Sequence, residues 1–119
     1  MALKTIRLEL ARTEEFPEGS ADYGYAFKAP LRADGHIDAD AWRVVKDQCT
    51  VRHFRPDEDD EHGLLIRPQG RTWAFSYAPG DDDDEPLFRF ESHAFKEGEY
   101  VSITGHDGKR LPFKVVNVR

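Results

Sequence analysis

The chain has 119 residues, of which 34% are charged and 39% apolar, and its formal net charge is −6. This length fits one domain spanning residues 1–119, and the sequence has no run of about 18 apolar residues, which argues against a membrane partner or a membrane-spanning helix. The single cysteine excludes an internal disulfide, and the first residues lack the apolar segment of a secretory signal, so we expect a cytoplasmic protein.

The negative charge is concentrated in two short segments, residues 57–61 and 81–85, which together hold ten of the 23 acidic residues. The other 109 residues carry 13 acidic and 17 basic side chains. The body of the protein is therefore expected to be mildly basic, although the whole chain is acidic.

The first half of the chain predicts two strands and one helix. Apolar and polar residues alternate in residues 3–11 and 23–31, the pattern of a half-buried strand. In the second strand glycine and alanine alternate with aromatic residues, so its small face leaves room for another element to approach closely. Residues 38–47 carry a helical pattern with Asp38 or Asp40 as the N-cap, and Trp42 would anchor this helix over an open end of the sheet.

The second half predicts a series of hairpins. Strands at residues 49–54 and 63–67 flank the first acidic segment, which we expect to be a loop. Residues 72–94 are expected to form an aromatic hairpin around the second acidic segment. The pairs predicted there are Tyr77 with Phe88 and Phe75 with Phe90, with Trp73 on the same face.

The C-terminal residues predict one further hairpin, formed by strands at residues 100–104 and 111–118. The pairs expected across it are Ile103 with Phe113 and Val101 with Val115. Two consecutive valines, Val115 and Val116, break the alternation and indicate a β-bulge.

These elements predict a mainly β fold. About seven or eight short strands and one short helix (about 38–47) would form an antiparallel curved sheet or partly closed barrel, with a two-sheet β-sandwich as the alternative. Consecutive strands usually pair, so we expect a meander from residue 49 to the C-terminus. Successive loops of a meander alternate between its ends, which would gather an acidic end containing His62, Asp82, Asp84, His106 and Asp107.

Any binding of a divalent cation at the acidic end is expected to be weak, because contiguous acidic residues cannot all converge on one ion as the spaced ligands of a calcium loop do. We expect its loops to be solvated and mobile, with a basic partner or the protein's own basic body as the second reading. The five histidines lack recognised ligand spacings. Cys49 is expected to pack as a small hydrophobic residue, so no catalytic residue, metal or cofactor is assigned.

A second candidate site is a basic and aromatic surface on neighbouring predicted strands. Aromatic and basic faces of small barrels bind single-stranded nucleic acid, but the calculated pI of 5.3 disfavours this partner. Pairing of the arginines with neighbouring acidic residues is the simpler explanation. The candidate residues are Arg52, Phe54, Arg55, Arg67 and Arg71.

The sequence does not determine a function. We favour a non-enzymatic binding domain with a protein partner, while nucleic acid is an unlikely partner and the oligomeric state is open. The alternative is a barrel that binds a small molecule or divalent metal, with or without a catalytic activity, and weak binding of single-stranded nucleic acid comes third. An open mouth lined by His62, His106 and Asp107 would favour the alternative, and a filled interior would favour the protein-binding domain.

Overall fold

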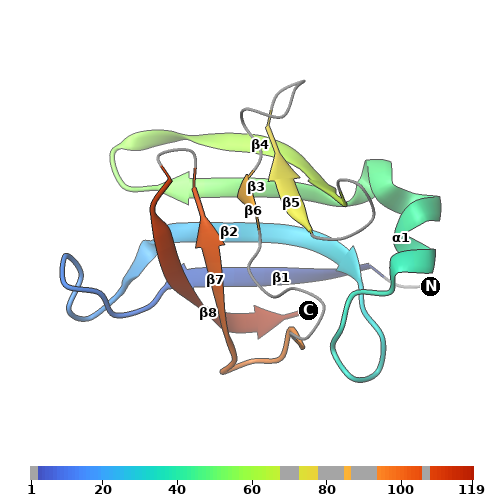
Figure 1. Cartoon of the computed structure of the whole chain (residues 1–119), viewed down its shortest axis with the longest axis horizontal. Coiled ribbons are helices and arrows are strands. Elements are labelled where there is room, and N and C mark those ends of the chain that lie inside the picture. The colour runs from blue at the N-terminus through green and yellow to red at the C-terminus, as the bar shows by residue number, and fades with distance from the viewer. Residues whose placement is uncertain (1–2, 68–72, 78–84, 87–93, 106–107) are drawn as a thin grey trace.

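Eight strands form one antiparallel sheet in the residues that the computed structural model describes, which are 3–67, 73–77, 85–86, 94–105 and 108–119 (Figure 1). The order of the strands across the sheet is β6-β5-β4-β3-β2-β1-β8-β7. Their bounds are β1 Leu3–Leu10, β2 Ser20–Pro30, β3 Thr50–Arg55, β4 Glu58–Ile66, β5 Ala74–Ser76, β6 Glu85–Pro86, β7 Tyr100–Thr104 and β8 Arg110–Val118.

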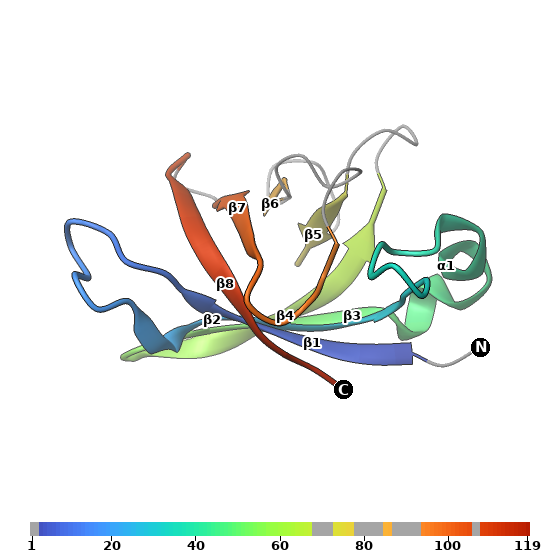
Figure 2. The same ribbon diagram turned by 90° about the horizontal axis from the view of Figure 1, so that it is seen from below.

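The sheet curls into a half-barrel, which confirms the prediction of a curved antiparallel sheet and excludes the two-sheet sandwich. Figure 2 shows β1, β2 and β3 as the base, with β5, β7 and β8 rising around a concave interior. Strands β6 and β7, at the two edges of the sheet, come close to each other. Alternating apolar side chains fill the concave face and form the core, among them Ile6, Leu8, Tyr25, Phe27, Val51, Leu65, Phe75, Val101, Ile103, Phe113 and Val115.

The predicted helix lies beside one end of the sheet, as α1 (Ala39–Val45) followed by the short 3₁₀ helix η1 (Lys46–Gln48). The carboxylate of Asp38 caps α1 by accepting a hydrogen bond from the Ala41 N–H at 3.1 Å. Trp42 anchors the helix as expected, because its indole N–H donates to the Leu65 carbonyl at 3.1 Å and its ring packs edge-on against Trp73. In the described ranges, no helix is long and apolar enough to cross a membrane.

The expected meander is wrong at its C-terminal end. The chain leaves β6 at one edge of the sheet and returns as β7 at the other, while β8 pairs with β1. The buried side chains Phe113 and Val115 of β8 lie opposite Leu10 and Leu8 of β1. Pairing with β8 thus extends the buried face of β1. This pairing cannot be predicted from the rule that consecutive strands lie side by side.

The register of the C-terminal hairpin also differs from the prediction by two residues. Val101 lies opposite Phe113, and Ile103 lies opposite Leu111. A shift of two residues leaves every side chain on its original face, so the apolar pattern cannot distinguish the two registers. The predicted bulge is confirmed, because the β1–β8 register skips Val116.

For the aromatic hairpin, the predicted face of the first strand is confirmed and the predicted pair of Phe75 with Phe90 is wrong. Trp73 and Phe75 are both buried on the concave side, but Phe75 lies opposite Glu85. Phe88 and Phe90, the predicted partners, lie outside the described residues. The second strand of this hairpin, β6, thus begins at Glu85, the last residue of the second acidic segment. Such a strand can form there because backbone hydrogen bonding does not require apolar side chains.

The first acidic segment is a strand and not the expected loop. Only Pro56 and Asp57 turn the chain, with Asp57 at a positive φ of 65°, and β4 begins at Glu58. Ion pairs join this segment to β3, as between Arg52 and Asp60, whose charged groups lie 3.6 Å apart. The segment is therefore not a mobile loop, and the protein's own basic strand offsets its charge, as the second reading anticipated.

Candidate functional site

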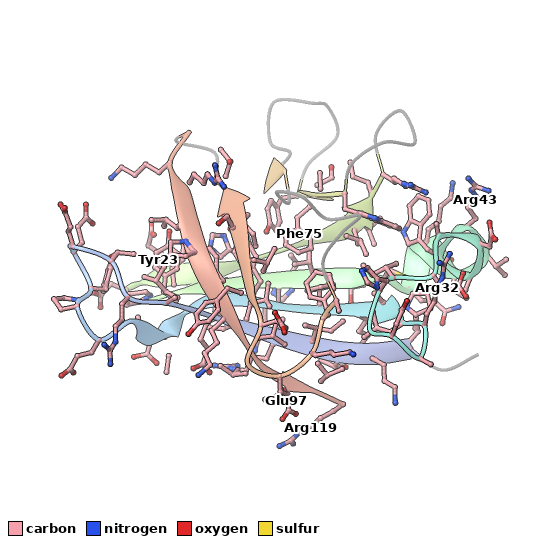
Figure 3. The ribbon with its side chains drawn as sticks, turned by 60° about the horizontal axis from the view of Figure 1, so that its bottom comes forward. Tyr23, Arg32, Arg43, Phe75, Glu97 and Arg119 are labelled. Atoms are coloured by element: carbon pink, nitrogen blue, oxygen red, sulfur yellow. The ribbon has the colours of Figure 1, made fainter. Side chains whose placement is uncertain are left out.

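A cavity of about 210 Å³ opens on the concave side of the sheet, at the end that carries the β3–β4 turn and the β7–β8 loop. We call it the mouth cavity. Its walls are the aromatic rings of Tyr23, Tyr25 and Phe113 together with the aliphatic side chains of Ile103 and Leu111. Tyr23 and Tyr25 point the same way because they are two residues apart on β2 (Figure 3 labels Tyr23).

His53 is the buried polar residue of this site, with only 4% of its surface exposed. Its ring stacks on Tyr25 with the centroids 4.2 Å apart and the planes 12° apart, and it meets Tyr23 edge-on. The Nδ1 atom lies 3.5 Å from a carboxylate oxygen of Glu61, the residue opposite His53 on β4. Aromatic packing and this carboxylate together fix the orientation of the imidazole.

Charged side chains form the rim of the mouth cavity. The Arg55 guanidinium lies 3.2 Å from Glu58 and 3.5 Å from Glu61, and it donates a hydrogen bond to the Asp59 carbonyl at 3.1 Å. On the other side of the rim, the Lys109 ammonium lies 3.9 Å from a Glu15 carboxylate. Both of these cations thus have an acidic neighbour, so the described part of the rim is polar and carries little net charge.

Two groups of chemical interest can be placed relative to the cavity: possible metal ligands and the cysteine. Within the described ranges, no three His, Cys, Asp or Glu side chains gather as a metal site would require. The cysteine is remote from the cavity lining, because Cys49 is fully buried and its thiol donates to the Val45 carbonyl at 3.5 Å. Cys49 therefore packs as a small hydrophobic residue, as the sequence predicted.

Burial raises the pKa of the Cys49 thiol from 9.0 to about 11, with the nearby Asp47 carboxylate as the smaller cause. We expect this shift to make stability fall as the pH rises from 9 towards 11. In that window the unfolded chain loses the thiol proton while the native protein keeps it, so the free energy of unfolding falls by up to roughly 2–3 kcal/mol. Denaturant unfolding across this pH range measures the effect.

Cys49→Ala is the matched control for this pH dependence, because tyrosines and lysines also titrate in the same range. The stability of the variant should fall less steeply with pH than that of the wild type. Parallel pH profiles for the two proteins would contradict a raised thiol pKa in the native state.

The predicted basic and aromatic surface is only partly assembled. Arg52 and Phe54 lie together on the convex face of the sheet, where Arg7 joins them. The two guanidinium carbons lie 4.4 Å (Arg7) and 5.5 Å (Arg52) from the centroid of the Phe54 ring, which is only 8% exposed. Because the arginines cover this ring, it offers little surface on which a base could stack.

The other members of that predicted surface lie elsewhere. Arg55 reaches the rim of the mouth cavity, and Arg67 lies near the other end of β4, with its guanidinium carbon 5.3 Å from the centroid of the Trp73 ring. Arg71 lies outside the described residues. Arg7, Arg52 and Arg55 all pair with acidic side chains, which agrees with the simpler explanation given for these arginines.

His62 is the one residue of the predicted acidic end that the structure describes. His62 is exposed within β4, opposite Arg52 in the β3–β4 ladder, so it does not line the mouth cavity. The remaining residues of this prediction, Asp82, Asp84, His106 and Asp107, lie outside the described residues. The described part of this end contains both acidic and basic groups, represented by Glu58 and Lys109.

Sequence reasoning missed the mouth cavity although a signal for it was present. Tyr23, Tyr25 and His53 all occupy positions that alternation assigns to the buried face, and all three carry polar atoms. Polar side chains on a core face indicate either a buried network or a site. The pairing of β2 with β3, which places Tyr25 opposite His53, brings these side chains together.

Comparison with known proteins adds no assignment, because no family model, curated protein or solved structure matches this chain at a significant level.

Proposed function

We propose that this protein is a non-enzymatic binding domain that holds a small, planar, uncharged molecule in the mouth cavity. The observation that carries the proposal is the combination of an open cavity, aromatic walls and a polar rim. Small-molecule sites are typically concave, mostly apolar and supplied with a few polar groups that orient the ligand. This proposal follows the alternative predicted from the sequence, a barrel that binds a small molecule. It places the ligand at other residues than the predicted His62, His106 and Asp107.

The size of the cavity limits the ligand to about one substituted ring. An apolar protein cavity of about 150 Å³ accepts benzene, and the mouth cavity measures about 210 Å³. The half-buried ring of Tyr23 offers a surface for edge-to-face or offset contacts with such a ring. The half-buried side chain of Leu111 supplies an apolar surface for its other side, while Tyr25 and Ile103, which are almost fully buried, form the floor of the cavity.

The charges around the cavity favour an uncharged ligand. Arg55 lies between two carboxylates, and Lys109 has Glu15 as a neighbour. A charged ligand would have to disturb these pairs or enter without a partner, which is costly in a partly enclosed site. A polar but neutral substituent, such as an amide or hydroxyl, can hydrogen-bond at the rim without that cost.

Three probes of similar shape and different charge test this proposal: benzamide, benzoate and benzamidine. We expect benzamide to cause saturable shifts in the ¹H–¹⁵N NMR spectrum at Tyr25, His53 and Phe113. A fragment of this size should bind with a dissociation constant on the order of 1 mM. The charged probes should bind more weakly, because each lacks a compensating charge at the rim.

Leu111→Trp provides a variant that fills the cavity, and Leu64→Trp is its matched control. Leu111 lines the cavity, whereas Leu64 is exposed on β4, with 39% of its surface accessible. The first substitution should weaken benzamide binding about tenfold or more, equivalent to 1.4 kcal/mol, and the second should leave binding unchanged. Shifts that do not saturate, or that survive Leu111→Trp, would contradict the proposal.

A protein partner stays a prediction, and the part of the predicted basic surface that the structure brings together is Arg52 and Phe54, with Arg7 beside them. Recovery of partners from lysate at low and high salt would test it, because an interface based on exposed arginines weakens as salt screens its charges. Binding to single-stranded nucleic acid also stays a prediction, and the burial of Phe54 disfavours it.

A further inference from the structure

A second pocket, of about 420 Å³, lies at the end of the sheet that carries α1. The chain forms it where the turn after β2, residues 31–37, approaches the start of β5. Arg32 lies beside the helix at this end, whereas Tyr23 lies towards the opposite end (Figure 3). The pocket therefore differs from the mouth cavity in position and in residues.

Basic side chains predominate among the charged groups of this pocket. Arg32, Arg67 and His36 line it, and among the described residues of its lining Asp34 is the one acidic side chain. The carboxylate of Asp34 accepts a hydrogen bond from the backbone N–H of His36 at 3.1 Å and lies 3.2 Å from the Nδ1 atom of the same residue. With neutral histidine the described residues of the lining carry one net positive charge, in a chain whose total is −6.

The two arginines differ in how firmly they are held. The guanidinium carbon of Arg67 lies 5.3 Å from the centroid of the Trp73 ring, so the ring holds this cation at the pocket wall. Trp73 is itself held by the edge-on contact with Trp42. Arg32 is exposed, and within the described part of the chain its guanidinium has no ion-pair or hydrogen-bond partner.

We infer that this pocket is a binding site for the phosphate group of a small molecule. A guanidinium presents several N–H donors in one plane and binds phosphate through two parallel hydrogen bonds. Arg32 supplies an exposed cation, whose described acidic neighbour is Asp34, and Arg67 supplies a second cation that Trp73 holds in place. Two hydrogen bonds hold the backbone turn, one from the Arg32 N–H to the His36 carbonyl and one from the Gly35 N–H to the Arg32 carbonyl. The turn thus fixes the place of the Arg32 backbone at the edge of the pocket.

Inorganic phosphate is the probe for this site, added to the full chain at constant ionic strength with chloride as the balancing anion. We expect saturable NMR shifts at the amides of Arg32 to His36 and at the indole N–H of Trp73. Acetate at the same concentration should bind more weakly, because it carries one charge and two oxygens. This comparison separates a phosphate site from general attraction of anions.

Arg32→Gln tests the residue on which the inference depends, with Arg43→Gln as the matched control. Arg43 is an exposed arginine of α1 that lies 3.5 Å from Asp40 and does not line the pocket. The first variant should weaken phosphate binding about tenfold, since it removes a charge-assisted hydrogen bond, and the second should not. Arg67→Lys, which keeps the charge but loses the planar fork, should weaken binding by a smaller factor.

Equal phosphate affinity in the wild type and Arg32→Gln would overturn the inference, as would shifts that rise linearly with phosphate and match those caused by acetate. Because the probe carries no ring and the variants leave the mouth cavity untouched, these outcomes are independent of benzamide binding there.

Discussion

Replacement of Phe75 by alanine is expected to lower the free energy of unfolding by about 3–5 kcal/mol, the usual cost of removing a buried phenylalanine. Phe75 is fully buried and packs against two other core rings, with centroid distances of 5.1 Å to Tyr25 and 5.2 Å to Phe27. A domain of this size is stable by only about 5–15 kcal/mol. Guanidinium or urea unfolding would measure the loss.

Tyr100→Ala is the matched control for Phe75→Ala, because it also removes one aromatic ring from a strand. Tyr100 lies in the edge strand β7 and is 55% exposed, so its loss should cost under about 1 kcal/mol. Similar losses in the two variants would mean that the concave face around Phe75 is not the core of the native protein.

Gly24→Ala is expected to destabilise the protein by about 2–3 kcal/mol although it adds only one methyl group. A Cβ atom at this position would overlap the backbone carbonyl of Leu8 and would lie 3.0 Å from the ring of Phe54. The carbonyl belongs to the paired strand β1 and cannot move without disturbing the sheet. The close approach expected from the small face of β2 is therefore present at this glycine.

Two further variants separate the causes of this loss. Lys28→Ala places alanine at an exposed position on the same strand and should change stability by less than about 0.5 kcal/mol. Gly24→Ala combined with Phe54→Leu should remain nearly as costly as the sum of the single changes, because the main overlap is with backbone. Wild-type stability of Gly24→Ala would contradict the packing described for β1, β2 and β3.

The candidate site was less predictable than the fold because its residues meet only through strand pairing. Periodicity placed Tyr25 and His53 on buried faces, but the β2–β3 register makes them neighbours. In the same way Arg52 and Arg55 were assigned to one surface from their proximity in sequence. The structure separates them, because Arg52 points to the convex face while Arg55 reaches the rim of the cavity.

Acidic residues were the most misleading feature of the sequence. A run of five like charges usually predicts a loop, yet residues 58–61 extend as a strand beside β3. The contacts that stabilise this arrangement, such as Arg52 with Asp60 and Arg55 with Glu58, lie between strands. Such compensation depends on the partner strand and cannot be inferred from the acidic segment alone.

The sequence by itself determined the class of fold, the approximate positions of its main strands, the short capped helix and the bulge at Val116. These features depend on local side-chain periodicity and capping, which neighbouring residues specify. Only the tertiary structure decided that β8 pairs with β1, that the sheet curls into a half-barrel and that Tyr23, Tyr25 and His53 line one cavity. These features depend on which distant segments pair, and several pairings preserve the same pattern of buried faces.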